Sequence, residues 1–334
     1  MELSKDAMRY LKKASLPASF APDKYQTEFN NIIKDFKDVE KPDVGLLGIP
    51  FDTTSIWSAR KGSSGAPAEV RRMFQYLGSY EPQLDVDISK GINIVDFGDV
   101  DVVHTNVEET YKRIEAVTKE IFDAGVSLVV IGGDHGNTFA TVKALCESMN
   151  GKGRVGLINV DSHPDVRESH HGELSSGTQF RRLITEINNN ILPGNFVEIG
   201  IRGWENNTAN QKFLTDNKIR YITANEVKER GIRDVMKEAV EIITDGTEAA
   251  YLSMDVDGLD ICYAPGTAAP TPGGLSSWDY LNIVYDFGIQ KIARGMDIME
   301  ISPLLDPTGI TSITGAFLVA QFFGAVKKRM QIHS

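Results

Sequence analysis

The sequence predicts an α/β fold in which a parallel sheet is covered by helices on both faces. From residue 43 onward, short apolar runs alternate with longer amphipathic stretches of helical periodicity. Strands that are apolar throughout are typical of parallel sheets buried on both faces. No repeat, low-complexity tract or Pro/Gly-rich linker divides the 334 residues. We therefore expect one domain over residues 41–334, preceded by an extension over residues 1–40.

The extension is polar and mixed, and its apolar residues predict one or two helices because they recur at helical spacing: Phe29, Ile32, Ile33 and Phe36. Eight apolar runs then predict eight strands, in chain order 43–48, 92–96, 127–131, 155–160, 196–200, 219–223, 249–255 and 294–300. Amphipathic patterns between these runs, such as 106–125 and 137–150, predict the covering helices.

Composition excludes several classes of protein. The net charge is −11 and no stripe of Lys and Arg is present, so a nucleic-acid partner is not expected. The two cysteines, Cys146 and Cys262, are far apart and predict no disulfide framework. The first twenty residues lack the apolar segment of a signal peptide, and the apolar runs are too short to span a membrane. We expect a cytoplasmic protein without a membrane partner.

Acidic and histidine side chains gather where three predicted strands end. One lies in the GGDH turn after 127–131, three alternate in DSHPD after 155–160, and two alternate in DVD at the end of 249–255. Residues two apart in an extended segment face the same side, and ligands of a parallel sheet gather at the carboxyl ends of its strands. The six candidate metal ligands are His135, Asp161, His163, Asp165, Asp255 and Asp257.

This set of side chains requires cations. Four carboxylates that converge in a partly buried site would repel one another, whereas two divalent ions bridged by carboxylates would balance them. An oxygen-rich site with some imidazole favours Mn²⁺ over zinc, and Ni²⁺ stays possible. Each motif alone is common turn or cap chemistry; their occurrence at three strand ends is what predicts a binuclear metal site.

The motifs resemble those of the ureohydrolase family, which comprises arginases, agmatinases and formimidoylglutamases. The similar segments are GGDHGNT (132–138), DSHPD (161–165) and SMDVDGLDICYAPGTAAPTPGG (253–274), and the likeness extends from about residue 43 to the end, agmatinase-like over most of it. The resemblance implies a three-layer α/β/α domain with an eight-stranded parallel sheet, and homo-oligomers such as trimers or hexamers. It also implies two Mn²⁺ ions, one held by His135, Asp161, Asp165 and Asp255 and the other by Asp161, His163, Asp255 and Asp257.

The same resemblance implies hydrolysis of a C–N bond in a linear amidine. Two metal ions would lower the pKa of a shared water, and Asp165 would accept its proton. Glu300, at the end of the last predicted strand, resembles the acid that pairs with the amidinium group of the substrate. The expected enzyme releases urea and an amine from a small guanidino compound.

The loop after DSHPD departs from arginases and agmatinases. Ser176 stands where their proton-shuttle histidine would be, in SSGTQF, and His171 a few residues upstream is a candidate replacement. Ala269 and Ile261 likewise replace an expected Thr and Pro. A Ser at this point is similar to formimidoylglutamase, which would release formamide and glutamate, and that activity is the alternative prediction.

Two charged residues bear on the tail of the substrate. Arg167, two residues beyond DSHPD, would suit a carboxylate. Glu205, beside Trp204, would suit a cation, unless Arg167 and Glu205 pair with each other. We favour a guanidino substrate, because most of the chain is agmatinase-like. A protein that binds ligand or supports a partner subunit without turnover is a further alternative, as is a deacetylase-like member of the same fold, whose pair of histidines is not found.

Overall fold

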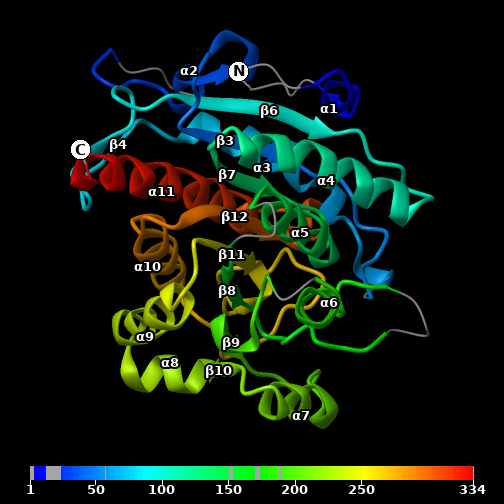
Figure 1. Cartoon of the computed structure of the whole chain (residues 1–334). Helices are drawn as coiled ribbons and strands as arrows, with labels where there is room; N and C mark the ends of the chain where they lie inside the picture. The colour runs from blue at the N-terminus through cyan, green and yellow to red at the C-terminus, as the bar shows by residue number, and fades with distance from the viewer. Residues whose placement is uncertain are drawn as a thin grey trace.

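A ten-stranded sheet runs through the part of the chain that the computed structural model describes, which is residues 4–12, 24–56, 58–149, 153–169, 174–187 and 190–333. All eight predicted strands are present and parallel to their neighbours. They are β3 (Val44–Gly48), β6 (Ile94–Val100), β7 (Ser127–Ile131), β8 (Val155–Val160), β9 (Phe196–Ile201), β10 (Arg220–Thr223), β11 (Ala249–Asp255) and β12 (Ala293–Met299). In Figure 1 they run from β6 at the top to β10 at the bottom.

One strand extends further than its apolar run. β6 starts two residues after the predicted run 92–96 begins and continues through Asp96 and Asp99 to Val100. Both acids are paired with the buried Arg71, at 2.8 Å from its Nε to Asp96 and 2.5 Å from its Nη1 to Asp99. Because the guanidinium compensates the two charges, the strand can carry acids that its sequence pattern alone would place in a loop.

The N-terminal segment adds two strands to the sheet edge that were not predicted. Its helices, α1 (Lys5–Arg9) and α2 (Phe29–Ile32), are short, and β1 (Leu11–Lys12) and β2 (Ile33–Asp35) follow them. β1 pairs antiparallel with the end of β6, and β2 pairs parallel with its beginning. The apolar spacing in 29–36 marks buried positions, but the helix ends at Ile32 because the next residues find hydrogen-bond partners on β6.

Helices cover both faces of the sheet, which gives three layers. One face packs against α3 (Ala66–Met73), α8 (Ala224–Arg230), α9 (Ile232–Thr244), α10 (Ser277–Gly288) and α11 (Ile310–His333). The other packs against α4 (Val107–Asp123), α5 (Thr138–Ser148), α6 (Gln179–Glu186) and α7 (Thr208–Asp216). Along β7, Val129 and Ile131 face the first group, and Leu128 and Val130 face the second. A small hairpin of β4 (Tyr80–Glu81) and β5 (Val86–Asp87) lies apart from the sheet.

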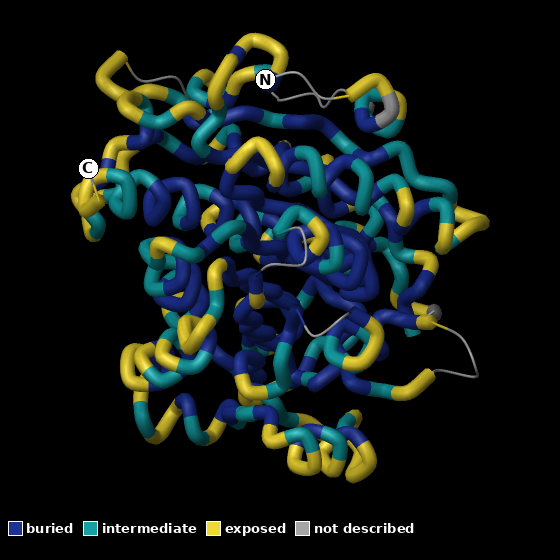
Figure 2. Tube along the Cα trace, in the orientation of Figure 1, coloured by how far each residue is buried: buried dark blue, intermediate teal, exposed yellow. Residues whose placement is uncertain are grey.

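The last helix is the most apolar element. α11 is long and apolar enough to cross a membrane by length and composition alone, which the short runs named above did not anticipate. However, 61% of its most apolar window is buried inside the protein, where it packs with α10 and α3. Figure 2 shows its course close to the dark-blue strands, with exposed residues concentrated on the outer helices.

Strand order brings distant parts of the chain together at the centre of the sheet. The order from β6 is β6-β3-β7-β12-β11-β8-β9-β10, so β12 lies between β7 and β11. The chain passes from β7 to β8 across the positions that β11 and β12 occupy. The carboxyl ends of β7, β12, β11 and β8 are therefore neighbours, and a reversal of strand order of this kind is where α/β sheets bind ligands.

Candidate metal centre

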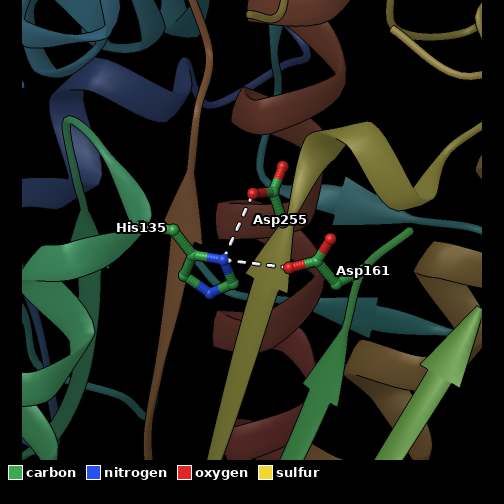
Figure 3. Close-up of side chains that lie close together, drawn as sticks. All are labelled: His135, Asp161 and Asp255. Atoms are coloured by element: carbon green, nitrogen blue, oxygen red, sulfur yellow. Dashed lines mark ion pairs between the residues drawn. The ribbon is translucent and has the colours of Figure 1, made fainter. Parts of the chain in front are cut away.

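The six predicted ligand residues converge at the carboxyl ends of β7, β8 and β11. β8 pairs with β11, and β12 lies between β11 and β7. His135 follows β7, Asp161 directly follows β8, and Asp255 is the last residue of β11. Figure 3 shows their side chains pointing toward one another from these separate segments. The close turn that carries His135 depends on Gly133, where a Cβ atom would lie 1.9 Å from the backbone oxygen of Phe51.

A first group of ligand atoms surrounds the Nδ1 atom of His135. Oδ2 of Asp161 lies at 3.1 Å from it, and Oδ2 of Asp165 and Oδ2 of Asp255 each lie at 3.2 Å. His135, Asp161 and Asp255 are almost fully buried. The ligand atoms of His135, Asp161 and Asp255 all lie within 4.8 Å of one another, so these three residues could hold a metal ion together.

A second group surrounds Nδ1 of His163. Oδ2 of Asp257 lies at 3.1 Å from this nitrogen and Oδ1 of Asp161 at 3.4 Å. Asp161 thus offers one oxygen to each group. The second oxygen of Asp257 accepts hydrogen bonds from the backbone N–H and the hydroxyl of Ser162, at 3.1 and 2.8 Å, which fix the orientation of its carboxylate.

Hydrogen bonds below the site determine which nitrogen of His135 carries its proton. The Oγ atom of Ser253 donates to Asp297 at 2.7 Å, so toward Nε2 of His135, at 2.8 Å, it can act only as acceptor. Nε2 therefore carries hydrogen, and Nδ1 is the nitrogen that would offer its lone pair to a cation bound among the three carboxylates. Neither Nδ1 nor the facing Oδ2 of Asp161 has a hydrogen-bond partner. Atoms that all offer lone pairs to one point fit a bound cation.

The electrostatics of the site also fit cations. Burial raises the pKa of Asp255 well above its usual range, and its neighbours Asp257 and Asp161 add to the effect. Burial likewise raises the pKa of Asp165. Burial alone would lower the pKa of His135, but the surrounding carboxylates raise it well above its ordinary value. Even two protonated imidazoles would not balance four aspartates and Glu300, so the residues fit a pair of divalent ions.

Glu300 lies immediately beyond β12, against the first group. Its Oε1 accepts the backbone N–H of His135 at 3.0 Å, and its Oε2 has no hydrogen-bond partner. Burial raises the pKa of Glu300 well above its usual range, with Asp255 and Asp134 contributing. Glu300 and Asp165 both have left-handed backbones, with φ of 65° and 46°. Non-glycine residues rarely adopt this conformation and do so most often at functional sites.

A pocket with an empty volume of about 440 Å³, which includes open solvent, gives access to both groups. Arg167 and Ser176 line its wall together with His163, Asp165 and Glu300. Ser176 is buried, and its backbone N–H donates to the oxygen of Thr54 at 2.9 Å. The pocket lining therefore combines one guanidinium, that of Arg167, with four acidic side chains, those of Asp165, Asp255, Asp257 and Glu300.

Two other candidate residues are not among the residues that line this pocket. Glu205 is exposed, as is Trp204, whose side chain is entirely accessible. Within the described residues no ion pair joins Arg167 and Glu205, so the predicted alternative that they neutralise each other is not found. His171 lies outside the described residues.

Several residues that shape the site were not predicted. Ser253 and Asp297 fix His135 from below, and Gln179 donates from its Nε2 to Asp165 Oδ2 at 2.6 Å. Asn206 and Thr267 line the pocket. Of these residues, the sequence could have identified only Ser253 as part of the site. It stands two residues before Asp255 and so shares a strand face with it. The others depend on contacts between segments far apart in the chain.

Comparisons with known proteins agree with this geometry. A model of the arginase family matches residues 42–324. A formimidoylglutamase of Halalkalibacterium halodurans is 29% identical over 315 residues, which cover 94% of this chain and 95% of that protein. The mitochondrial agmatinase of Gallus gallus is 32% identical over 279 residues, covering 83% and 79%. The solved structure of a formimidoylglutamase from Bacillus subtilis subsp. subtilis str. 168 is similar with a TM-score of 0.85 and 27% identity, covering 96% and 98%.

Proposed function

The chain belongs to the arginase family and is a hydrolase of C–N bonds in guanidino or formimino compounds, and on this premise we propose that its substrate carries a carboxylate at the end remote from the amidine. Both an ω-guanidino acid and a formimino amino acid meet this description. A cationic compound such as agmatine does not.

The chemistry at the amidine end follows from the acidic side chains. Two divalent ions in the two groups would supply Lewis-acid activation of a water. The carboxylate of Asp165 lies in the pocket wall, where it would accept a proton from such a water. The free Oε2 of Glu300 faces the amidinium, whose positive charge favours the ionised form of this buried acid.

The observation that carries the proposal for the tail is the guanidinium of Arg167. Among the described residues no carboxylate pairs with it, although it lines a pocket that also contains four acids. A half-buried cation without a protein counter-charge is a ready partner for an anionic group of the substrate. The ammonium of agmatine would instead be repelled by it.

The choice between the two acidic substrates rests on the loop around Ser176. A serine here is shared with formimidoylglutamase by resemblance, and relatives of that name cover nearly the whole chain. Agmatinase and guanidinobutyrase are as similar in sequence, at 32% and 31% identity. We therefore propose only that the substrate is an acidic amidine. Release of urea would identify it as a guanidino acid, and release of formamide would identify it as a formimino amino acid.

The test is steady-state kinetics of wild type and Arg167→Ala on agmatine, 4-guanidinobutyrate, formiminoglutamate and free guanidine. We expect an acidic substrate to be preferred and to lose about 10- to 100-fold in kcat/KM in the variant, since a charge-assisted hydrogen bond is removed. The kcat/KM for free guanidine, which has no tail that could reach Arg167, should change little. A wild-type preference for agmatine, with no loss in the variant, would contradict the carboxylate proposal.

We propose three further properties. Mn²⁺ is the proposed ion, because four carboxylates and two imidazoles form an oxygen-rich donor set; elemental analysis of protein purified without chelator tests this. The chain is proposed to act in the cytoplasm as a homo-oligomer of three or six copies, which light scattering of the purified protein and fractionation of cells would test.

A further inference from the structure

Residues 267–269 of the segment 265–270, PGTAAP, form part of the pocket wall. Thr267, Ala268 and Ala269 line the pocket, whereas Arg60, which is exposed and not part of the lining, holds the segment from outside. The Nη2 atom of Arg60 donates to the backbone oxygen of Thr267 at 3.1 Å, and its Nε donates to that of Ala268 at 2.8 Å. One guanidinium therefore binds two consecutive carbonyl groups.

This contact determines where the two peptide N–H groups point. In a trans peptide, the C=O of one residue and the N–H of the next point in opposite directions. Because both carbonyls point toward Arg60, the N–H groups of Ala268 and Ala269 point away from it, and Arg60 is not among the residues that line the pocket. Within the described residues neither N–H has a hydrogen-bond acceptor.

A second observation at the same place is independent of the backbone. The side chain of Thr267 is fully buried and lines the pocket, and its Oγ1 has no hydrogen-bond partner. An unpaired buried hydroxyl costs free energy unless a ligand satisfies it. The alanines at 268 and 269 carry no polar group that could turn back and occupy these donors.

We propose that the N–H groups of Ala268 and Ala269, the hydroxyl of Thr267 and the guanidinium of Arg167 form the subsite that binds the carboxylate of the substrate, and that Arg60 is the positioning residue that orients the two peptides. This proposal rests on the proposed function, since it assigns a place to the acidic tail. Four donors from residues that line one pocket, one of them charged, would match the acceptor oxygens of a carboxylate and offer no acceptor to an ammonium group.

The subsite also explains how an anion can bind in a pocket that four acidic side chains line. Asp165, Asp255, Asp257 and Glu300 line the same pocket and would repel a carboxylate that approached them. The proposed donors would bind the acidic tail, while the amidinium end, which is cationic, would be attracted to these acids. The two ends of the substrate are thereby sorted by charge.

The test compares the preferred acidic substrate of the wild type with its primary amide, using full-length, Mn²⁺-loaded protein. In Arg60→Met and in Thr267→Val we expect KM for the acid to rise about 10-fold. The kcat should stay within about twofold, because the lost donors act on ground-state binding of the tail. KM for the amide should rise clearly less than KM for the acid, because the neutral carbonyl oxygen of an amide accepts weaker hydrogen bonds than a carboxylate does. Calorimetric titration with 4-aminobutyrate gives a readout independent of turnover and should weaken in parallel.

Lys61→Met is the matched control, because it removes a positive charge from the adjacent residue, whose Nζ donates only to the backbone oxygen of Thr53, at 3.2 Å. It should leave KM for the acid unchanged. An equal rise in Lys61→Met, or an equal rise for acid and amide in Arg60→Met, overturns the subsite. If Arg167→Ala abolishes the acid preference while Arg60→Met and Thr267→Val keep it, the subsite is wrong and the proposed function stands. A wild type without acid preference overturns both.

Discussion

At the scale of single residues, the ligand residues of the metal centre are positioned by hydrogen bonds from β11 and β12 as well as by their own charges. Ser253 accepts from His135 and donates to Asp297, which also accepts from Thr138 at 2.8 Å. Asp297 and Ser253 are register partners on β12 and β11. Groups that fix the tautomer and ring orientation of a ligand histidine commonly tune metal affinity by 10- to 100-fold.

Ser253→Ala should therefore weaken metal binding. Without the acceptor at Nε2, His135 can rotate or change tautomer, and we expect the dissociation constant for Mn²⁺ to rise about 10-fold or more. Equilibrium dialysis with elemental analysis measures it. The control is Ser127→Ala. It removes a buried hydroxyl from the first residue of β7, at the strand end away from the site, where the Oγ atom accepts a hydrogen bond from Arg329 at 2.7 Å. Equal affinities in the two variants would show that Ser253 has no part in holding the metal.

The sequence could predict the acids and imidazoles of this site because each stands just beyond an apolar run, and topology then brings strand ends together. It could not predict Ser253 as a hydrogen-bond relay, since that role depends on its register with Asp297. Nor could it predict the donors of Thr267, Ala268 and Ala269, whose orientation depends on Arg60, some 208 residues away in the chain. Side-chain chemistry is visible in a sequence, and contacts between distant loops are not.

Asp260 gives a prediction of pH dependence. Hydrogen bonds from Cys262 lower its pKa to about 2, and the N–H groups of Gly274 and Gly273 contribute. The pKa of Asp260 in the folded protein is lower than its value of about 3.9 in the unfolded chain. The ionised carboxylate therefore stabilises the folded protein above about pH 3.9, and this stabilisation is lost as the pH falls toward 2. Asp260→Asn should cost about 1 kcal/mol at pH 7, since solvent screens this carboxylate. Urea unfolding of metal-free protein should show the difference shrinking between pH 4 and 2.5; a difference constant with pH would refute the assignment.

At the scale of elements, the eight long strands are predictable because burial on both faces demands continuous apolar side chains. β1 and β2, of two and three residues, give no such pattern, and only the free edge of β6 stabilises them as strands. The apolar length of α11 was also not recognised, because small residues such as Gly315 and Gly324 interrupt it. Tertiary contacts, which a local pattern cannot contain, decide these cases.

The packing of α9 on β8 leads to a prediction about Gly156. A Cβ atom at this position would lie 2.1 Å from the backbone oxygen of Ile243 and 2.7 Å from its Cβ, so the helix would have to move. Gly156→Ala should lower the free energy of unfolding by about 1–3 kcal/mol. Gly194→Ala, where nothing lies within 4 Å, should change it by less than about 0.5 kcal/mol. Thermal unfolding at fixed Mn²⁺ concentration compares them, and equal stabilities would mean that α9 and β8 are less tightly packed than described.

At the scale of the whole molecule, the acids buried at the carboxyl ends of the central strands lead us to expect that stability depends on bound cations. Asp161, Asp255 and Asp257 are almost fully buried beside one another, and their mutual repulsion must be offset for the layers to close. A ligand that binds only the folded state stabilises it by an amount that grows with its concentration over the dissociation constant, about 4 kcal/mol at a thousandfold excess.

Chelation should therefore lower the melting temperature by several degrees, and Mn²⁺ should restore it with close to two ions per chain. Calorimetric melting and elemental analysis of the same samples measure both quantities. Asp161→Ala removes the residue that faces both groups and should show little stabilisation by Mn²⁺. One tightly held zinc per chain, or a melting temperature indifferent to chelation, would be incompatible with a binuclear centre.

The position of β12 also has a consequence for synthesis. β12 is the last strand that the ribosome completes, yet it lies between β7 and β11. Until residues 293–299 have emerged, the strands before them can form only two half-sheets, one with β7 and one with β11, each with an apolar edge unpaired. His135 belongs to one half and Asp161 and Asp255 to the other. A nascent chain thus brings its metal ligands together only after β12 has been synthesised, and a product truncated before β12 would present two open edges to chaperones or to other chains.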